Sequence, residues 1–83
     1  MARVPDFELS GPGYVYSQVA AHIERRIRAG ELAPGARLAN ERDLAEEYQV
    51  ALGTIRRAME VLREKGLVIT MPSTGTYVKE LDA

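Results

Sequence analysis

The chain has 83 residues, enough for one small domain, and its 46% content of hydrophobic residues supports a compact core. It contains no cysteine and a single histidine, which excludes a disulfide framework and a thiolate or clustered metal site, so no cofactor is expected. No apolar run approaches the ~20 residues of a membrane span, and the N-terminus lacks the basic and apolar regions of a signal peptide. We therefore expect a cytoplasmic protein with no membrane partner.

The charge balance does not by itself indicate nucleic-acid binding. Eleven Lys and Arg residues stand against twelve Asp and Glu residues, for a formal net charge of -1, whereas a DNA-binding domain usually carries a basic excess. The charges are nevertheless segregated along the chain. The acids gather at Glu41, Asp43, Glu46 and Glu47, and the cations at Arg56, Arg57, Arg63 and Lys65. Because phosphate contacts are local, this placement matters more than the total.

Residues 1–13 predict an N-terminal arm. The segment carries two prolines and two glycines and shows no sustained periodicity, which is typical of a flexible segment. Phe7 and Leu9 are apolar side chains in the arm that can dock on the body of the domain.

The first helix is predicted over residues 14–29. Gly30 is a natural C-cap for it, and Pro34 and Gly35 predict a turn shortly afterwards. His22 lies within the helical pattern and is expected at the core edge or on the surface, because no second ligand accompanies it. The apolar side chains recur at steps of three or four and define the buried face: Tyr16, Val19, Ala20, Ile23 and Ile27.

A short second helix is predicted over residues 41–48, after an extended link at 37–39. Asn40 offers an N-cap side chain, and Asp43 stands three residues further on, as the acid of a capping box does. Acids in the first turn also favour the positive end of the helix dipole. The buried side chains are expected to be Leu44, Ala45 and Tyr48.

A third helix is predicted over residues 52–65, after a three-residue break at 49–51. Gly66 ends the pattern, and the exposed side carries Thr54 together with several cations. Two helices joined by such a tight turn form a helix-turn-helix. The buried stripe is expected to be Ile55, Ala58, Met59 and Leu62.

The last part of the chain changes to β character. Residues 67–71 are rich in β-branched side chains, residues 72–75 form a turn cluster, and residues 76–79 resume alternation. These features predict a hairpin. The predicted fold class is therefore α+β, a winged helix-turn-helix of three helices and a C-terminal wing over residues 14–79, followed by a short tail at 80–83.

Several stretches together resemble the DNA-binding domain of GntR-type transcription regulators. The run Leu-Ala-Asn-Glu-Arg-Asp-Leu-Ala-Glu at 38–46 resembles the family's Leu-Pro-Ser-Glu-Arg-Glu-Leu-Ala. The run Tyr-Ser-Gln-Val-Ala at 16–20 resembles Tyr-x-Gln-Ile-Ala, and the turn at 30–35 is also typical. Residues 54–59 with Leu62 resemble the family's recognition helix, and residues 66–68 resemble the segment that follows it. The wing motif Gly-Thr-Tyr-Val at 75–78 completes a match over about residues 14–79. The run Thr-Ile-Arg-Arg-Ala at 54–58 slightly favours the HutC-type branch.

The resemblance implies a sequence-specific bacterial transcription regulator, a repressor by expectation, whose third helix enters the major groove. Its partner would be a double-stranded DNA operator, bound as a homodimer on a two-fold site. No small-molecule effector domain is expected within so short a chain. The residues that the resemblance assigns to DNA are Arg42, Leu52, Gly53, Thr54, Arg56, Arg57, Ser73, Thr74, Gly75 and Thr76.

The resemblance implies different DNA contacts for these residues. Arg42 and Arg56 match DNA-contacting positions, and arginine suits both guanine edges and phosphates. Thr54 matches a phosphate-contacting position, and residues 73–76 would approach the minor groove or backbone. The alternative for Arg56 is a solvated helix face or an ion pair with Glu60, four residues on.

The chain departs from the family pattern between the second and third helices. Gln49 stands where glycine is usual, and a side chain there is strained by roughly 1 kcal/mol if φ is positive. Ala51 stands where a Ser or Thr cap is usual, a loss of typically about 1 kcal/mol. Leu52 replaces an arginine that commonly contacts bases, and Gly53 follows it. Leu52 can instead contact a thymine methyl or pack against neighbours.

Two other functional classes are alternatives to a transcription regulator. A winged-helix protein-interaction module with weak or lost DNA affinity is favoured by the near-neutral charge and by Leu52 and Gly53. An enzyme is disfavoured because the chain has no cysteine, one histidine and no phosphate-binding glycine loop.

Overall fold

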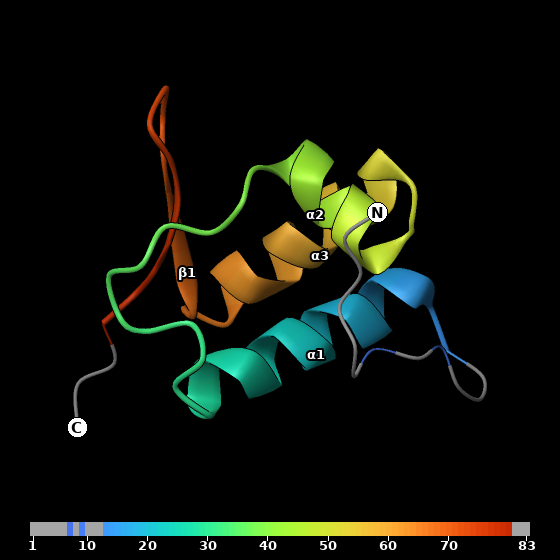
Figure 1. The fold of residues 1–83 in the computed structure, drawn as a ribbon, viewed down its shortest axis with the longest axis horizontal. Helices are drawn as coiled ribbons and strands as arrows, with labels where there is room; N and C mark the ends of the chain where they lie inside the picture. Colours follow the sequence, from blue (N-terminus) through green and yellow to red (C-terminus); the bar gives the residue numbers. More distant parts are fainter. Residues whose placement is uncertain (1–6, 8, 10–12, 81–83) are drawn as a thin grey trace.

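The computed structural model describes residue 7, residue 9 and residues 13–80, which form three helices and a two-stranded antiparallel sheet (Figure 1). This confirms the predicted α+β architecture. The elements run in the order α1 (Val15–Arg28), α2 (Glu41–Tyr48), α3 (Leu52–Glu64), β1 (Val68–Met71) and β2 (Gly75–Val78). Within the described residues, no helix has the length and apolar character to cross a membrane.

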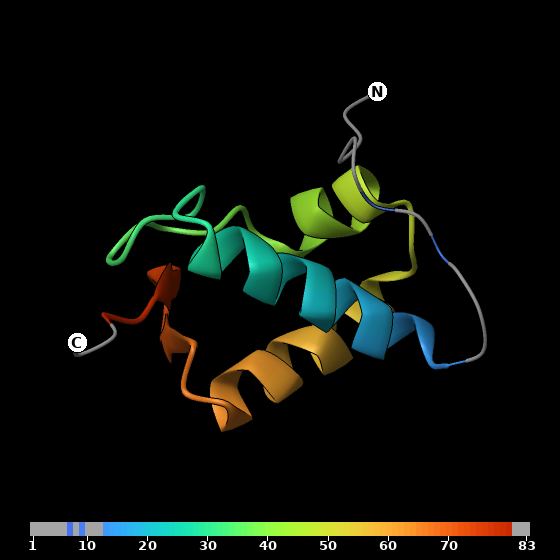
Figure 2. The same cartoon turned by 90° about the horizontal axis from the view of Figure 1, so that it is seen from below.

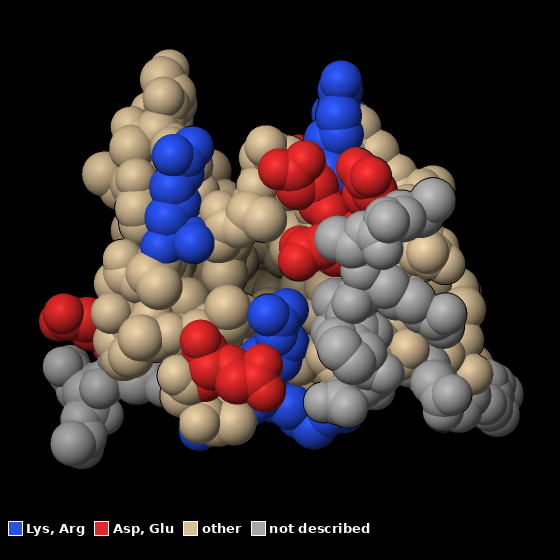
Figure 3. All heavy atoms as spheres, viewed as in Figure 1, with Lys and Arg blue, Asp and Glu red and all other residues tan. Residues whose placement is uncertain are grey.

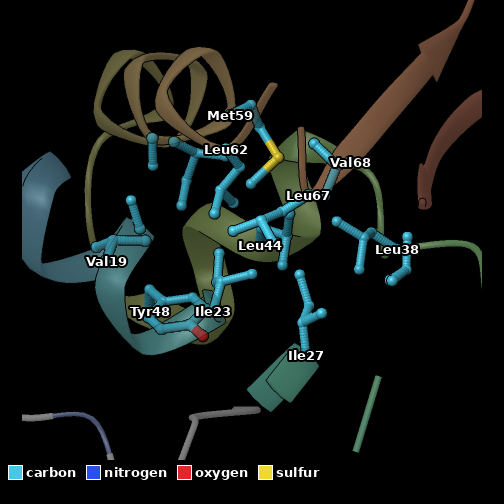
Figure 4. Close-up of a cluster of buried hydrophobic side chains, with 14 of the residues drawn as sticks. Val19, Ile23, Ile27, Leu38, Leu44, Tyr48, Met59, Leu62, Leu67 and Val68 are labelled. Atoms are coloured by element: carbon cyan, nitrogen blue, oxygen red, sulfur yellow. The ribbon is translucent and has the colours of Figure 1, made fainter. Parts of the chain in front are cut away.

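Helices α1 and α3 lie side by side in both ribbon views (Figures 1 and 2). Their facing stripes supply half of the core residues, and α2 packs across them (Figure 4). The predicted stripe of α3 is confirmed, since Ile55 and Leu62 are fully buried. In α1 the stripe is also confirmed, except that Tyr16 is only half-buried, at the helix start, where its ring lies against Arg57 of α3. Truncating a buried side chain of this size to alanine costs about 2–5 kcal/mol.

The helix ends follow local chemistry. Asn40 caps α2 as predicted, its side chain accepting a 2.8 Å hydrogen bond from the backbone N–H of Asp43. Gly30 takes a left-handed conformation (φ 84°) just beyond the end of α1. Gln49 ends α2 at φ 56° and ψ 49°, which confirms the expectation of a positive φ at this position. Ala51 has the extended backbone of an N-cap but provides no side-chain hydrogen bond to α3.

The wing is a hairpin whose strands pair in the register Val68 with Val78 and Met71 with Gly75. The link between α1 and α2 adds to its far edge. The N–H of Gly35 donates to the carbonyl of Val78, the N–H of Val78 donates to Ala36, and the N–H of Leu38 donates to Thr76, each at 2.8 Å. Leu38 thereby reaches the core, and the wing and the start of α2 are held as one unit.

The arm contributes one side chain to the core. Phe7 is buried and meets the rings of His22 and Tyr48 edge-on, with centroids 5.4 and 4.9 Å away. His22 is buried rather than on the surface, the first of the two places expected for it, and its Nδ1 lies 2.8 Å from the Tyr48 hydroxyl. Leu9 is 55% exposed and does not dock. The remainder of the predicted arm, apart from Gly13, lies outside the described residues, as does the tail beyond residue 80.

Candidate nucleic-acid interface

The helix-turn-helix is closed by the left-handed residue between α2 and α3. Gln49 reverses the chain, and the N–H of Val50 donates back to the carbonyl of Ala45 at 3.0 Å. Ala51 is therefore extended when α3 begins at Leu52. The first turn of α3 presents Leu52 half-buried, Gly53 exposed and Thr54 half-buried. A Cβ at Gly53 would meet nothing within 4 Å, so the helix start is open to an approaching molecule.

Arg56 is held by a carboxylate on the neighbouring helix. Its Nε lies 3.4 Å from an Oε of Glu41 at the start of α2, and both side chains are substantially exposed. The alternative considered from the sequence, an ion pair between Arg56 and Glu60, is wrong. Glu60 instead lies 3.4 Å from Arg57, three residues away on the helix. An exposed pair of this kind contributes about 0–1 kcal/mol, so Arg56 can exchange Glu41 for another anion at small cost.

Arg57 lies against the start of α1. Its guanidinium carbon lies 5.0 Å from the centroid of the Tyr16 ring, which in turn stacks on Tyr14. A hydrogen bond with Tyr16, followed by the charges of Tyr16 and Glu60, raises the pKa of Arg57. The side chain therefore stays charged. It contacts both Tyr16 of α1 and Glu60 of α3, at the end of the molecule where α1 and α3 begin.

Arg42 is exposed in the first turn of α2. Within residues 13–80 it has no ion pair and no side-chain hydrogen bond. A cation that forms no ion pair can meet a phosphate with no internal contact to break. In this respect Arg42 differs from both Arg56 and Arg57.

The tip of the wing carries hydroxyl groups rather than cations. Ser73 adopts a left-handed backbone (φ 63°), and the N–H of Thr74 donates to Met71 at 3.0 Å to close the turn. The hydroxyl of Thr76 lies 3.1 Å from that of Thr70 across the hairpin. These groups can donate and accept hydrogen bonds but supply no charge of their own.

A groove of about 400 Å³ separates the wing from α2 and α3. Its walls include Asn40 and Glu41 from the start of α2 on one side and the wing residues 70–76 on the other. The space-filling view shows a hollow between the wing and α2, with cationic side chains on both sides of it (Figure 3). The wing-tip residues and the start of α2 thus share one groove, whereas Leu52, Gly53, Thr54, Arg56 and Arg57 lie outside its walls.

Two cations of this groove were not among the DNA-binding residues expected from the sequence. Arg63 donates to the Thr70 hydroxyl at 3.1 Å, and Arg37 lines the groove from the link. The sequence contained a signal for Arg37. In an extended link, successive side chains point to opposite sides, so a buried Leu38 places Arg37 outside.

Comparison with known proteins agrees with this geometry. Residues 15–78 match the family model described as bacterial regulatory proteins, gntR family. The mannosyl-D-glycerate transport/metabolism system repressor MngR of Escherichia coli is 39% identical over 66 residues, which are 80% of this chain and 28% of that protein. This chain therefore spans little more than a quarter of that relative.

Solved structures show the same arrangement of elements. A GntR family transcriptional regulator from Listeria monocytogenes superimposes with a TM-score of 0.80 at 33% identity, over 90% of this chain and 64% of that one. The DNA-binding domain of AraR, solved in complex with operator ORX1, gives a TM-score of 0.75 at 29% identity over 86% of this chain and 92% of that one. With sequence and structure in agreement over nearly all the described residues, the chain belongs to the GntR family of bacterial regulatory proteins.

Proposed function

We propose that this chain binds double-stranded DNA sequence-specifically as the DNA-reading domain of a bacterial transcription regulator that acts as a repressor. The observation that carries the proposal is the exposed face of the first half of α3, with Gly53, Arg56 and Arg57, on a helix that follows a tight turn after α2 and lies beside a wing. A second helix placed in this way enters the major groove in helix-turn-helix proteins. The operator complex of the similar AraR domain and the repressor function of MngR support the same conclusion.

The proposed interface consists of three parts. In the first turn of α3, Leu52 and Gly53 would face the base edges, and Leu52 would contact a thymine methyl rather than a guanine. Thr54 and Arg57 would contact the backbone. The remaining members are Arg42 at the start of α2, Arg56 on α3, and Ser73, Thr74, Gly75 and Thr76 on the wing.

Arg56 is proposed to make the principal cationic contact with base edges or phosphate. Its Nε is already held by Glu41 of α2, so part of the entropy of ordering a long side chain is lost before DNA arrives. Arg42 has no such partner in the described part of the chain, and it would bind the backbone on the other side of the helix-turn-helix. Exchange of Glu41 for DNA would depend on salt, as for any exposed ion pair.

The proposal includes a homodimer on a two-fold operator. The two-fold symmetry of a dimer is matched by a palindromic operator whose two half-sites lie one helical turn apart. The run of residues 54–58 slightly favours the HutC-type branch by resemblance. What a complete relative senses is not carried over, since this chain spans 28% of MngR.

The test is fluorescence anisotropy of the purified chain with a randomised duplex pool at two salt concentrations, with selection and sequencing of the bound duplexes. We expect enriched two-fold sites and an affinity that falls as salt rises. Binding with no enriched sequence would refute sequence-specific reading. No binding at low salt would refute the DNA-binding function and favour a protein-interaction module.

Leu52 provides a sharper test of the reading mode. Leu52→Arg should move the preferred base at one operator position from an A·T pair to a G·C pair, because arginine pairs with the O6 and N7 of guanine. Leu52→Met is the matched control that keeps an apolar side chain and should keep the original preference. If Leu52→Arg left both affinity and base preference unchanged, Leu52 would not face the bases.

A further inference from the structure

At the start of β2, the side chain of Arg37 occupies the space that a Cβ on Gly75 would need. Gly75 begins β2 with φ 142°, and a Cβ built there would lie 2.7 Å from Nε of Arg37 and 3.4 Å from its guanidinium carbon. Real Cβ atoms essentially never approach another heavy atom so closely. The guanidinium of Arg37 therefore lies on the bare backbone of Gly75, in the place that a side chain would fill.

The position of Arg37 is fixed by the backbone as well. Arg37 forms an isolated antiparallel bridge with Tyr77, and its two neighbours, Ala36 and Leu38, bond to Val78 and Thr76 of β2 at 2.8 Å. Leu38 is buried in the core, which sets the direction of the link. The backbone of Arg37 is thus held along the wing, and its exposed side chain lies over Gly75.

The charge of Arg37 is nevertheless uncompensated. Among the described residues, Arg26, Arg28, Arg56, Arg57 and Lys65 each lie within 4 Å of a carboxylate. Arg37 has no carboxylate partner and no side-chain hydrogen bond in that part of the chain. A cation without a counter-charge is suited to an external anion, because no internal ion pair must break.

The surroundings of Arg37 fit a phosphodiester. The same groove is lined by Arg63, which donates to Thr70, whose hydroxyl lies 3.1 Å from that of Thr76. Glu41 is the carboxylate in the groove wall, and it is engaged by Arg56. Two guanidinium groups and a pair of hydroxyls therefore face the open side, where a strand of DNA would pass between α2 and the wing.

We propose that Arg37 binds a backbone phosphate of DNA and that Gly75, placed above among the wing residues of the interface, contributes to binding by leaving room for this guanidinium. The inference rests on the proposed function and names a further contact for it. The wing then contributes positive charge through the link that pairs with it, although its own tip carries none.

The measurement is the slope of log K against log salt for a fixed operator duplex. Each phosphate contact contributes about 0.9 to this slope on B-DNA, so Arg37→Gln should lower it by about 0.9 per chain. Equivalently, the loss of affinity between 50 and 200 mM salt should shrink by about 3.5-fold per chain. Arg37→Lys, which keeps the charge, should keep the slope.

Arg25→Gln is the matched control. Arg25 is an exposed arginine on α1, it is absent from the groove wall, and it has no ion pair within residues 13–80. The substitution changes the net charge by the same amount and should leave the slope unchanged. Equal slopes for Arg37→Gln and Arg25→Gln would overturn the inference while the proposed function stands. Failure of the unaltered chain to bind any duplex would overturn the proposed function, and the inference with it.

Gly75→Ala tests whether Gly75 provides the space in which the Arg37 guanidinium lies. The added Cβ should displace Arg37 and lower the slope as Arg37→Gln does, and the double variant should show no further decrease. Because φ is positive at Gly75, the variant is also strained, so its thermal unfolding is measured alongside. An additive decrease in the double variant would show that Gly75 touches DNA independently of Arg37 and would overturn the seating role.

Discussion

The uncapped start of α3 predicts that one added hydroxyl will stabilise the domain. Ala51 has the φ of -66° and ψ of 152° of an N-cap but offers no side-chain acceptor, while Asn40 fulfils that role for α2 with a 2.8 Å bond. Both positions are exposed. Ala51→Ser should therefore place a hydroxyl near the free N–H groups of the first turn of α3 without disturbing any packing.

The magnitude follows from the geometry of the two caps. A serine or asparagine cap is worth about 1 kcal/mol over alanine, and the extended backbone at Ala51 requires no rearrangement. For a domain of this size, 1 kcal/mol corresponds to a change of about 4–8 °C in Tm. Ala51→Ser should raise Tm by that amount, and Asn40→Ala should lower it by a similar amount.

Thermal unfolding followed by circular dichroism at 222 nm measures both changes. Ala29→Ser is a control for the added hydroxyl, since Ala29 lies exposed at the opposite end of a helix, where no N–H is free to bond. If Asn40→Ala lowered Tm while Ala51→Ser left it unchanged, the start of α3 would not have the cap geometry described. A gain from Ala29→Ser equal to that from Ala51→Ser would also refute the reasoning.

Three further predictions concern stability. Gln49→Gly should raise Tm, because relief of a left-handed conformation costing about 1–2 kcal/mol exceeds the entropy that glycine adds to the unfolded chain; an unchanged or lower midpoint would contradict this. Phe7→Ala should lower the urea midpoint by removing the ring that meets His22 and Tyr48, whereas Leu9→Ala should have little effect because Leu9 is exposed. Bonds from Lys65, then from Arg28, lower the pKa of Glu24 below its usual 4.5. The stability from this group is therefore complete above about pH 4.5 and is lost as pH falls through the lower folded-state value. Lys65→Met should cost stability at pH 7 and progressively less in acid, measured as Tm against pH.

The elements could be predicted from the sequence because their boundaries are set by neighbouring residues. Gly30, Asn40 and Gly66 mark ends by conformation or by side-chain bonding, and the structure places the helix ends within one residue of the prediction. The strand ends differ in the same small way, because Gly75 already pairs with Met71 and belongs to β2.

The contacts of the candidate interface could not be predicted in the same way. Helical spacing suggests an ion pair between Arg56 and Glu60, because residues four apart lie on the same helix face. In the structure, Glu41 of another helix pairs with Arg56 instead. The seat of Arg37 depends on Gly75, which is far away in the sequence. Local rules carry no information on such pairs, since the packing of α2 and the wing on α3 determines them.

The hydrogen bonds between the α1–α2 link and β2 have a consequence for synthesis of the chain. All three helices can form from local contacts, which assemble fast. The N–H groups of Gly35 and Leu38, by contrast, have their acceptors on Val78 and Thr76, near the last described residues. On the ribosome, the link must therefore stay hydrated until β2 has emerged from the exit tunnel. The groove, whose walls include both segments, is completed after every helix that borders it.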